Sequence, residues 1–277
     1  MLTLTENFIE DKFTIDELLK RSWSFRNSDE FIKFFDFIAR FNHYSRYNTM
    51  LVYIQNPAVT FFGGVSYWKK NFGRTIKEEA RPYIILAPMG PVLLVYDVFD
   101  TEGKETPEQF LERNLGRKPN NVKGRINARV LANAITEAEN WGIKIKYKPL
   151  SYFNGGYVTT IFSNRLEICL KEGASIEESL AVLIHELAHL YLGHTGHQEL
   201  FYKEKDKPAK LLQRKISRSA EELEAETISY LICKKLGLQS SSAEYIAGYI
   251  TCETDLIEFS YETVIKIADK IEKLFVK

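Results

Sequence analysis

The sequence lacks the features of disulfide-stabilised, membrane-spanning and strongly charged proteins. Its 277 residues include only three cysteines, widely spaced and odd in number, so neither a disulfide framework nor a thiolate zinc site is expected. Lysine plus arginine and aspartate plus glutamate both number 37, so no net charge attracts nucleic acid or membrane. The most apolar span, Tyr83 to Phe99, is interrupted by Pro88 and Pro91. We therefore expect a cytoplasmic protein that is neither exported nor inserted in a membrane.

The segment pattern predicts an α+β fold in two domains. We expect a small first domain at residues 1–115, a linker at 116–127 and a second domain at 128–277, because GRKPNNVKGR is polar, basic and punctuated by glycine. Helices and strands are predicted from apolar spacing, capping residues and β-branched runs. The helices are 29–41, 46–55, 107–115, 128–141 and 176–192, and the strands are 82–88, 91–99, 143–149 and 165–171, with turns at 89–90 and 155–156.

Histidines cluster in the second half of the chain. Four of the five histidines stand at positions 185, 189, 194 and 197. Ser175 and Glu178 fit a capping box and Gly193 follows the apolar run, so residues 176–192 are predicted to form one helix. On that helix His185 and His189 lie one turn apart on the same face, where both can bind a single zinc ion.

A catalytic zinc site of this type needs a third protein ligand. The candidates are His194, His197 and the acidic run SAEELEAETISYLIC. The histidine spacing does not fit the long metzincin motif, so both histidines are interpreted as loop residues. We expect Glu222 to bind the metal and Glu226, one turn further, to hydrogen-bond a ligand histidine. Glu224 is predicted to point elsewhere.

The predicted chemistry is metal-assisted hydrolysis of a peptide bond. Zinc lowers the pKa of a bound water and polarises a carbonyl, and Glu186 would take the water's proton and pass it to the leaving amine. Two histidines and a glutamate also suit manganese or another divalent ion. The alternative is a merely structural histidine pair, which the acidic helix downstream disfavours.

Two stretches resemble a known family. HELAHLYLGH followed by EELEAETISYLICKKLGL resembles the ImmA/IrrE-like zinc metallopeptidases, particularly the C-terminal domain of ArdC-type antirestriction proteins. The N-terminal domain of that family is similar to FIARFNHYSRYNTMLVYIQNPAVTFFGGVSYWKKNFGRTI, the following hairpin and VFDTEG. The resemblance covers roughly residues 25–105 and 150–250.

The resemblance implies a single-stranded DNA-binding domain joined to a zincin-like metallopeptidase domain. Such a protein is carried on a mobile element and protects incoming DNA from restriction. Aromatic rings interleaved with basic residues fit sequence-tolerant binding of single strands. The candidate DNA contacts carried over from the family are Tyr44, Tyr47, Asn48, Trp68, Lys69, Lys70, Arg74 and Lys77. Helical spacing instead predicts core positions for Phe31, Phe34, Phe35 and Phe41.

One segment departs from the family pattern, and two other functions stay open. Residues 77–81 read KEEAR where the family has a turn of the type K-G-E-K-G, which weakens the expected phosphate affinity. The protein could coat single-stranded DNA with its peptidase dormant, in which case Glu186→Gln would leave DNA protection unchanged and Trp68→Ala would abolish it. It could also be an ImmA-like regulatory protease that cuts a repressor, and lack of oligonucleotide binding would favour that function.

Overall fold

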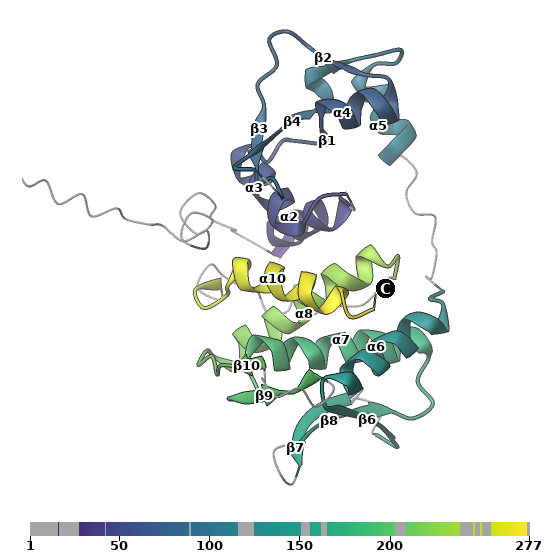
Figure 1. Cartoon of the computed structure of the whole chain (residues 1–277), viewed down its shortest axis with the longest axis vertical. Coiled ribbons are helices and arrows are strands. Elements are labelled where there is room, and N and C mark those ends of the chain that lie inside the picture. Colours follow the sequence, from purple (N-terminus) through teal and green to yellow (C-terminus); the bar gives the residue numbers. More distant parts are fainter. Residues whose placement is uncertain are drawn as a thin grey trace, which may run out of the picture.

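The computed structural model describes residues 16, 28–41, 43–88, 90–115, 125–150, 156–161, 165–202, 209–238, 246, 250 and 256–275. Within them the fold mixes helices with several small sheets (Figure 1). None of the helices in these ranges is long and apolar enough to cross a membrane.

Helices and strands are interspersed along the described residues. The helices are α2 (Ser28–Arg40), α3 (Arg46–Gln55), α4 (Val65–Tyr67), the π-helical η1 (Trp68–Phe72), the 3-10 helical η2 (Val98–Asp100), α5 (Pro107–Leu115), α6 (Ala128–Asn140), α7 (Ile176–Leu192), α8 (Arg218–Lys235) and α10 (Tyr261–Glu272). The strands are β1 (Phe62–Gly64), β2 (Thr75–Ile76), β3 (Tyr83–Ile85), β4 (Leu93–Asp97), β5 (Thr101–Glu102), β6 (Ile143–Lys148), β7 (Gly156–Ile161), β8 (Arg165–Lys171), β9 (Gln198–Leu200) and β10 (Ala209–Leu211).

All five predicted helices and all four predicted strands are present, with ends that shift by a few residues at most. Strands β3 and β4 pair antiparallel as the predicted hairpin requires, although Met89 of its turn lies outside the described residues. The linker prediction falls largely on residues 116–124, which also lie outside them, and the domain boundaries stay a prediction.

The predicted turn at residues 155–156, between the strands 143–149 and 165–171, is wrong. Those two strands run parallel, and Gly156 itself begins a further strand, β7, so the sheet beside α7 has an order that the sequence did not indicate. Strand β8 is central, with β6 parallel on one side and β7 antiparallel on the other. Strand β7 begins at Gly156, where an added Cβ would lie 2.4 Å from Val182 and 2.7 Å from the carbonyl oxygen of Cys169. Glycine is therefore required for β7 to approach α7 this closely, and this places an edge strand beside the histidine-bearing helix.

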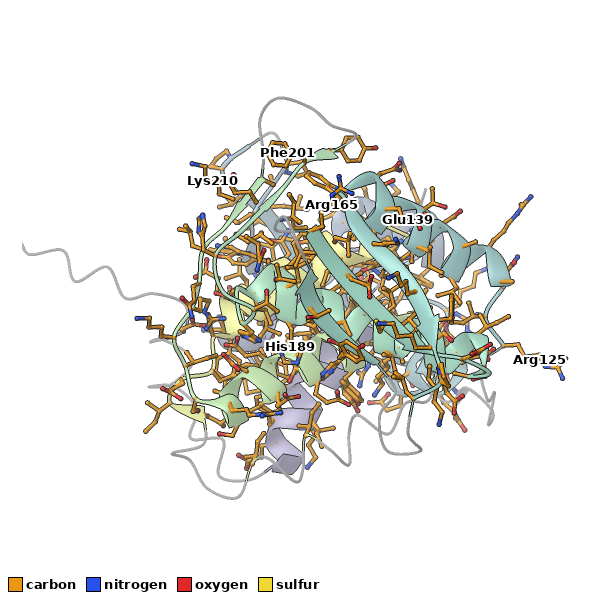
Figure 2. All side chains as sticks on the ribbon, turned by 90° about the horizontal axis from the view of Figure 1, so that it is seen from below. Arg125, Glu139, Arg165, His189, Phe201 and Lys210 are labelled. Carbon is orange, nitrogen blue, oxygen red and sulfur yellow. The ribbon has the colours of Figure 1, made fainter. Side chains whose placement is uncertain are left out.

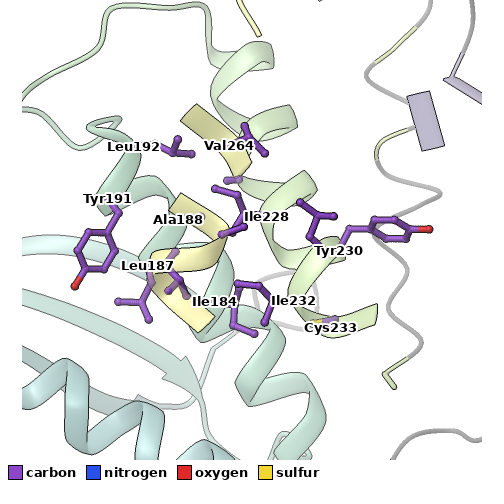
Figure 3. Close-up of a cluster of buried hydrophobic side chains, with 14 of the residues drawn as sticks. Ile184, Leu187, Ala188, Tyr191, Leu192, Ile228, Tyr230, Ile232, Cys233 and Val264 are labelled. Carbon is purple, nitrogen blue, oxygen red and sulfur yellow. The ribbon is translucent and has the colours of Figure 1, made fainter. Parts of the chain in front are cut away.

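The helices form layers between the two larger sheets (Figure 1). Helices α2 and α3 lie on α8 and α10, while α7 and α6 lie between these and the sheet of β6, β7 and β8. One buried hydrophobic cluster runs from Phe31 of α2 to Phe275 after α10, and Figure 3 shows its centre where α7, α8 and α10 meet. The core positions predicted for Phe31, Phe34, Phe35 and Phe41 are confirmed, because all four rings are buried.

Candidate metal centre

Helix α7 holds both motif histidines within a well-bounded helix. The Ser175 hydroxyl accepts a hydrogen bond from the Glu178 backbone, and the Ser175 backbone donates to the Glu178 carboxylate, so the predicted capping box is confirmed. The helix ends before Gly193, whose φ of 79° is favourable for glycine. Figure 2 marks His189 in a view from the side of the β6–β8–β7 sheet.

Three side chains from two helices converge at one point. Nε2 of His185 and Nε2 of His189 lie 3.1 Å apart, and Oε2 of Glu222 on α8 lies 3.5 Å and 3.6 Å from them. Ligand atoms about 2.0–2.1 Å from a tetrahedral zinc ion stand about 3.3 Å from one another. The three side chains therefore could hold a metal ion.

The Glu226 carboxylate supports His185 from behind. Its Oε2 lies 2.9 Å from Nδ1 of His185, the nitrogen that faces away from the three-ligand point. Burial lowers the pKa of His185, but hydrogen bonds to Glu222 and Glu226 outweigh it and raise that pKa to about 10. Contacts with both histidines hold the pKa of Glu222 well below its usual range. Without a metal the group thus binds a proton, and a metal must displace it.

Glu186 is buried next to the same point. The residue is 8% exposed, and burial raises the pKa of its carboxyl, while electrostatic interactions with the neighbouring histidines act in the opposite direction. The carboxylate accepts a hydrogen bond from the backbone N–H of Val158 on the edge strand β7. Glu186 is therefore fixed between helix and sheet, with a pKa shifted toward neutral pH.

His194 lies in the turn after α7, as the loop interpretation expects, but its side chain is buried. Its Nδ1 lies 3.0 Å from Nδ1 of His189, and its Nε2 lies 3.2 Å from Oε2 of Glu224. The side chains of His194 and Glu224 are 2% and 0% exposed. Glu224 is outside the three-ligand group, as predicted, but its carboxylate contacts His194 behind the candidate metal site. His197 is exposed.

The carboxylate of Glu224 is held from several sides. Arg214 donates to both of its oxygens, at 2.5 Å and 2.9 Å, and the backbone N–H of Ser260 donates to Oε1 at 2.8 Å. Burial raises the pKa of Glu224, but the contacts with His194 and Arg214 outweigh it, so the pKa is lowered overall. Glu224 is therefore ionised and fully paired.

The sequence at the end of α7 contains a signal for the position of His194. The His194 N–H donates to the His189 carbonyl and the Gly193 N–H to the Leu190 carbonyl, which is the Schellman arrangement. This turn brings the second residue after the helix back against the side chain four residues before the glycine. Glycine after HLYL therefore places His194 beside His189, and this consequence was missed.

Two of the predicted DNA contacts lie in the interior. Trp68 is 0% exposed, packs with Val98 and Phe110, and donates its indole N–H to the Tyr96 carbonyl. Arg74 is 1% exposed and donates to the Thr101 hydroxyl and carbonyl and to the Glu105 carbonyl. Their hydrogen bonds are used within the fold, so neither side chain faces a ligand in this conformation.

The other candidate DNA contacts divide into engaged and exposed side chains. The Tyr44 hydroxyl accepts from the Gly64 backbone, Asn48 pairs with the Leu86 backbone, and Tyr47 packs against the main core. The three lysines, at positions 69, 70 and 77, are exposed. Lys77 donates a hydrogen bond to the Phe99 carbonyl. The structure therefore does not gather the eight residues into one surface.

Comparisons with known proteins give one partial match. The uncharacterized protein pXO2-81 of Bacillus anthracis is 32% identical over 138 residues, which cover 45% of this chain. The match covers 20% of that protein, so the chain spans only a small part of its relative. No model of a known protein family matches the sequence, and no solved structure matches it.

Proposed function

We propose that this protein is a zinc-dependent peptidase in which His185, His189 and Glu222 hold the ion and Glu186 is the general base. The observation that carries the proposal is the triangle of ligand atoms, 3.1–3.6 Å on each side, formed next to a buried carboxylate. A surface histidine pair with solvated glutamates would not bring one atom from each of three side chains to a common point.

The surrounding residues supply the remaining chemistry. A bound zinc ion would supply Lewis acidity, lowering the pKa of water and polarising a carbonyl. The raised pKa of Glu186 makes its carboxylate a better proton acceptor near neutral pH than an exposed glutamate. The Val158 N–H keeps that carboxylate in place, and Glu226 orients His185 with its Nε2 toward the site.

Elemental analysis of the full chain, purified without added metal, tests the metal site. We expect about one equivalent of zinc in the wild type and much less in Glu222→Ala. Glu221→Ala is the matched control, because its carboxylate is on the same helix but outside the three-ligand group, and it should retain the zinc. No metal in the wild type would overturn the proposal.

Cleavage of a peptide library tests the role of Glu186. Glu186→Gln keeps the size of the side chain and removes the base, so it should retain zinc and lose hydrolysis. A variant that cleaves as fast as the wild type would contradict the mechanism. Zinc binding without cleavage by the wild type would instead favour a protein whose peptidase is dormant.

Binding of single-stranded DNA by the first half stays a prediction. The match to a plasmid protein of Bacillus anthracis is compatible with a mobile-element origin, which the family resemblance implies. Among the eight candidate DNA contacts, the exposed side chains are those of Lys69, Lys70 and Lys77. Trp68→Ala is no longer a clean test, because truncating a buried tryptophan costs about 3–5 kcal/mol of stability. If no oligonucleotide binds, a regulatory protease that recognises a protein is favoured.

A further inference from the structure

We propose that His194 is a positioning residue that fixes the ring orientation and tautomer of His189, and that Glu224 and Arg214 hold His194 in that role. The inference rests on the proposed metal site and concerns what prepares the site for its ion. Neither His194 nor Glu224 belongs to the three-ligand group, and both are almost fully buried behind it.

If His189 binds a metal, only one arrangement of protons fits the hydrogen bonds from His189 through His194 to Glu224. Its Nε2 then carries the lone pair, so its Nδ1 carries the proton and donates it to Nδ1 of His194 at 3.0 Å. His194 must therefore carry its proton on Nε2, which lies 3.2 Å from the Glu224 carboxylate, an acceptor. A carboxylate at the far end thus selects, through His194, the metal-binding tautomer of His189.

The far end of this chain is anchored by separate segments. Glu224 lies on α8, Arg214 follows β10, and Ser260 precedes α10. Because all three meet at one buried carboxylate, the position of His194 is set by the packed core and not by the loop after α7 alone.

The two metal-facing histidines are thereby supported in parallel ways. Nδ1 of His185 contacts the Glu226 carboxylate at 2.9 Å, and Nδ1 of His189 contacts His194. Partners of this kind contribute to metal affinity because they hold each ring in its ligating orientation. His194 is therefore expected to matter for zinc binding although it does not touch the ion.

Zinc affinity of the full chain, measured by competition with a chromophoric chelator, tests this role. His194→Leu removes both hydrogen bonds and should weaken zinc binding by about 10–100-fold. His194→Asn keeps an oxygen acceptor near the Nδ1 position, so it should restore most of the affinity. His197→Asn is the matched control, since His197 is exposed three residues further on, and should bind zinc like the wild type.

Two further readouts separate positioning from a merely structural role. The visible spectrum of the cobalt(II) protein should change in His194→Leu and return toward that of the wild type in His194→Asn. Thermal unfolding of the metal-free variants measures any general loss of stability. If His194→Leu acted only by destabilising the fold, His194→Asn would not restore zinc affinity.

Equal zinc affinity of wild type and His194→Leu would overturn this inference and leave the proposed function intact. Absence of zinc from the wild type would overturn both, whereas the expected affinities without hydrolysis would contradict only the peptidase activity.

Discussion

The Arg46 guanidinium on α3 donates a hydrogen bond to the Asp269 carboxylate on α10 at 2.6 Å, joining residues 223 positions apart. A second nitrogen of Arg46 lies 2.7 Å from Glu272, one turn further along α10. The Arg46 side chain is only 3% exposed, so this cation depends on the two carboxylates for its solvation.

Arg46→Met should destabilise the protein by about 2–4 kcal/mol, because the Asp269 carboxylate loses this cation in a partly buried place, while Glu272 keeps its contact with Lys235. Urea unfolding checks this. Arg113→Met is the control, since Arg113 is 60% exposed and pairs with Glu105 at the surface, where loss of the pair costs about 0–1 kcal/mol. Equal losses in the two variants would contradict the importance of the buried contact.

Gly193→Ala should be more damaging than Gly173→Ala, although both glycines have φ of 79°. An added Cβ meets nothing within 4 Å at Gly173 but lies 2.1 Å from the Leu212 carbonyl at Gly193. We expect a cost of about 1–2 kcal/mol for the left-handed backbone alone. The overlap should add about 1–3 kcal/mol at Gly193. Thermal unfolding of the metal-free proteins measures the difference, and identical midpoints would show that the turn can open.

Asn48 and Gln55 of α3 cover the edge of β3. The Asn48 amide accepts from and donates to the Leu86 backbone, both at 2.9 Å, and Gln55 makes the same pair of bonds with Ile84 at 2.9 Å and 2.8 Å. Asn48→Ala and Gln55→Ala should each cost about 0.5–1.5 kcal/mol, because two exposed backbone groups exchange their amide partner for water. Unfolding free energies check this. A DNA-affinity loss without a stability loss in Asn48→Ala alone would instead support the predicted DNA contact.

The double variant Lys69→Glu/Lys70→Glu tests the predicted DNA interface. Each lost phosphate contact should reduce the salt dependence of single-strand binding by about 0.7 in the slope of log affinity against log salt. Fluorescence anisotropy with a labelled oligonucleotide measures that slope. Lys144→Glu is the control, because Lys144 is also exposed but lies on β6. An unchanged slope in the double variant would remove these lysines from the interface.

Acid should destabilise the sheet of β6, β7 and β8 through Glu167. Its carboxylate lies 2.6 Å from Lys146 and 3.2 Å from Lys148, and these hydrogen bonds lower its pKa to about 2, although burial opposes them. Because this pKa is below that of an unfolded glutamate, the contribution is present above about pH 4.5 and is lost as the pH falls toward 2. The wild type should therefore be more stable than Glu167→Gln at neutral pH, and the difference in their unfolding free energies should shrink in acid. A difference that stays constant with pH in urea unfolding would contradict this.

The helices were predictable because local rules decide them. Ser175, Glu178 and Gly193 bound α7 by capping chemistry, and apolar spacing located α2. The pairing of β6 with β8 was not predictable, because parallel partners are chosen by packing between distant segments. The same limit explains Trp68: an aromatic ring beside lysines fits a stacking surface, and only the tertiary contact with Phe110 shows it to be core.

For the candidate site, too, the features that depend on local sequence were predictable and those that depend on distant segments were not. The histidine motif and its helix follow from spacing within one segment, and the choice of Glu222 and Glu226 followed from their shared face on α8. Burial of Glu224 required Arg214 and Ser260, which come from other segments. The neighbours of Glu224 in the sequence, Leu223 and Ala225, give no sign of such partners.

The packing of α2 and α3 on α8 and α10 has a consequence for proteolysis. Phe31, Phe34 and Phe35 contact Phe259 and Tyr261, and Arg46 reaches Asp269, so both sides of residues 116–124 contribute to one apolar and ionic contact. A single cut within 116–124 would therefore leave two fragments that stay together on a sizing column. Produced separately, the same fragments would each expose aromatic rings and should recover their solubility when mixed.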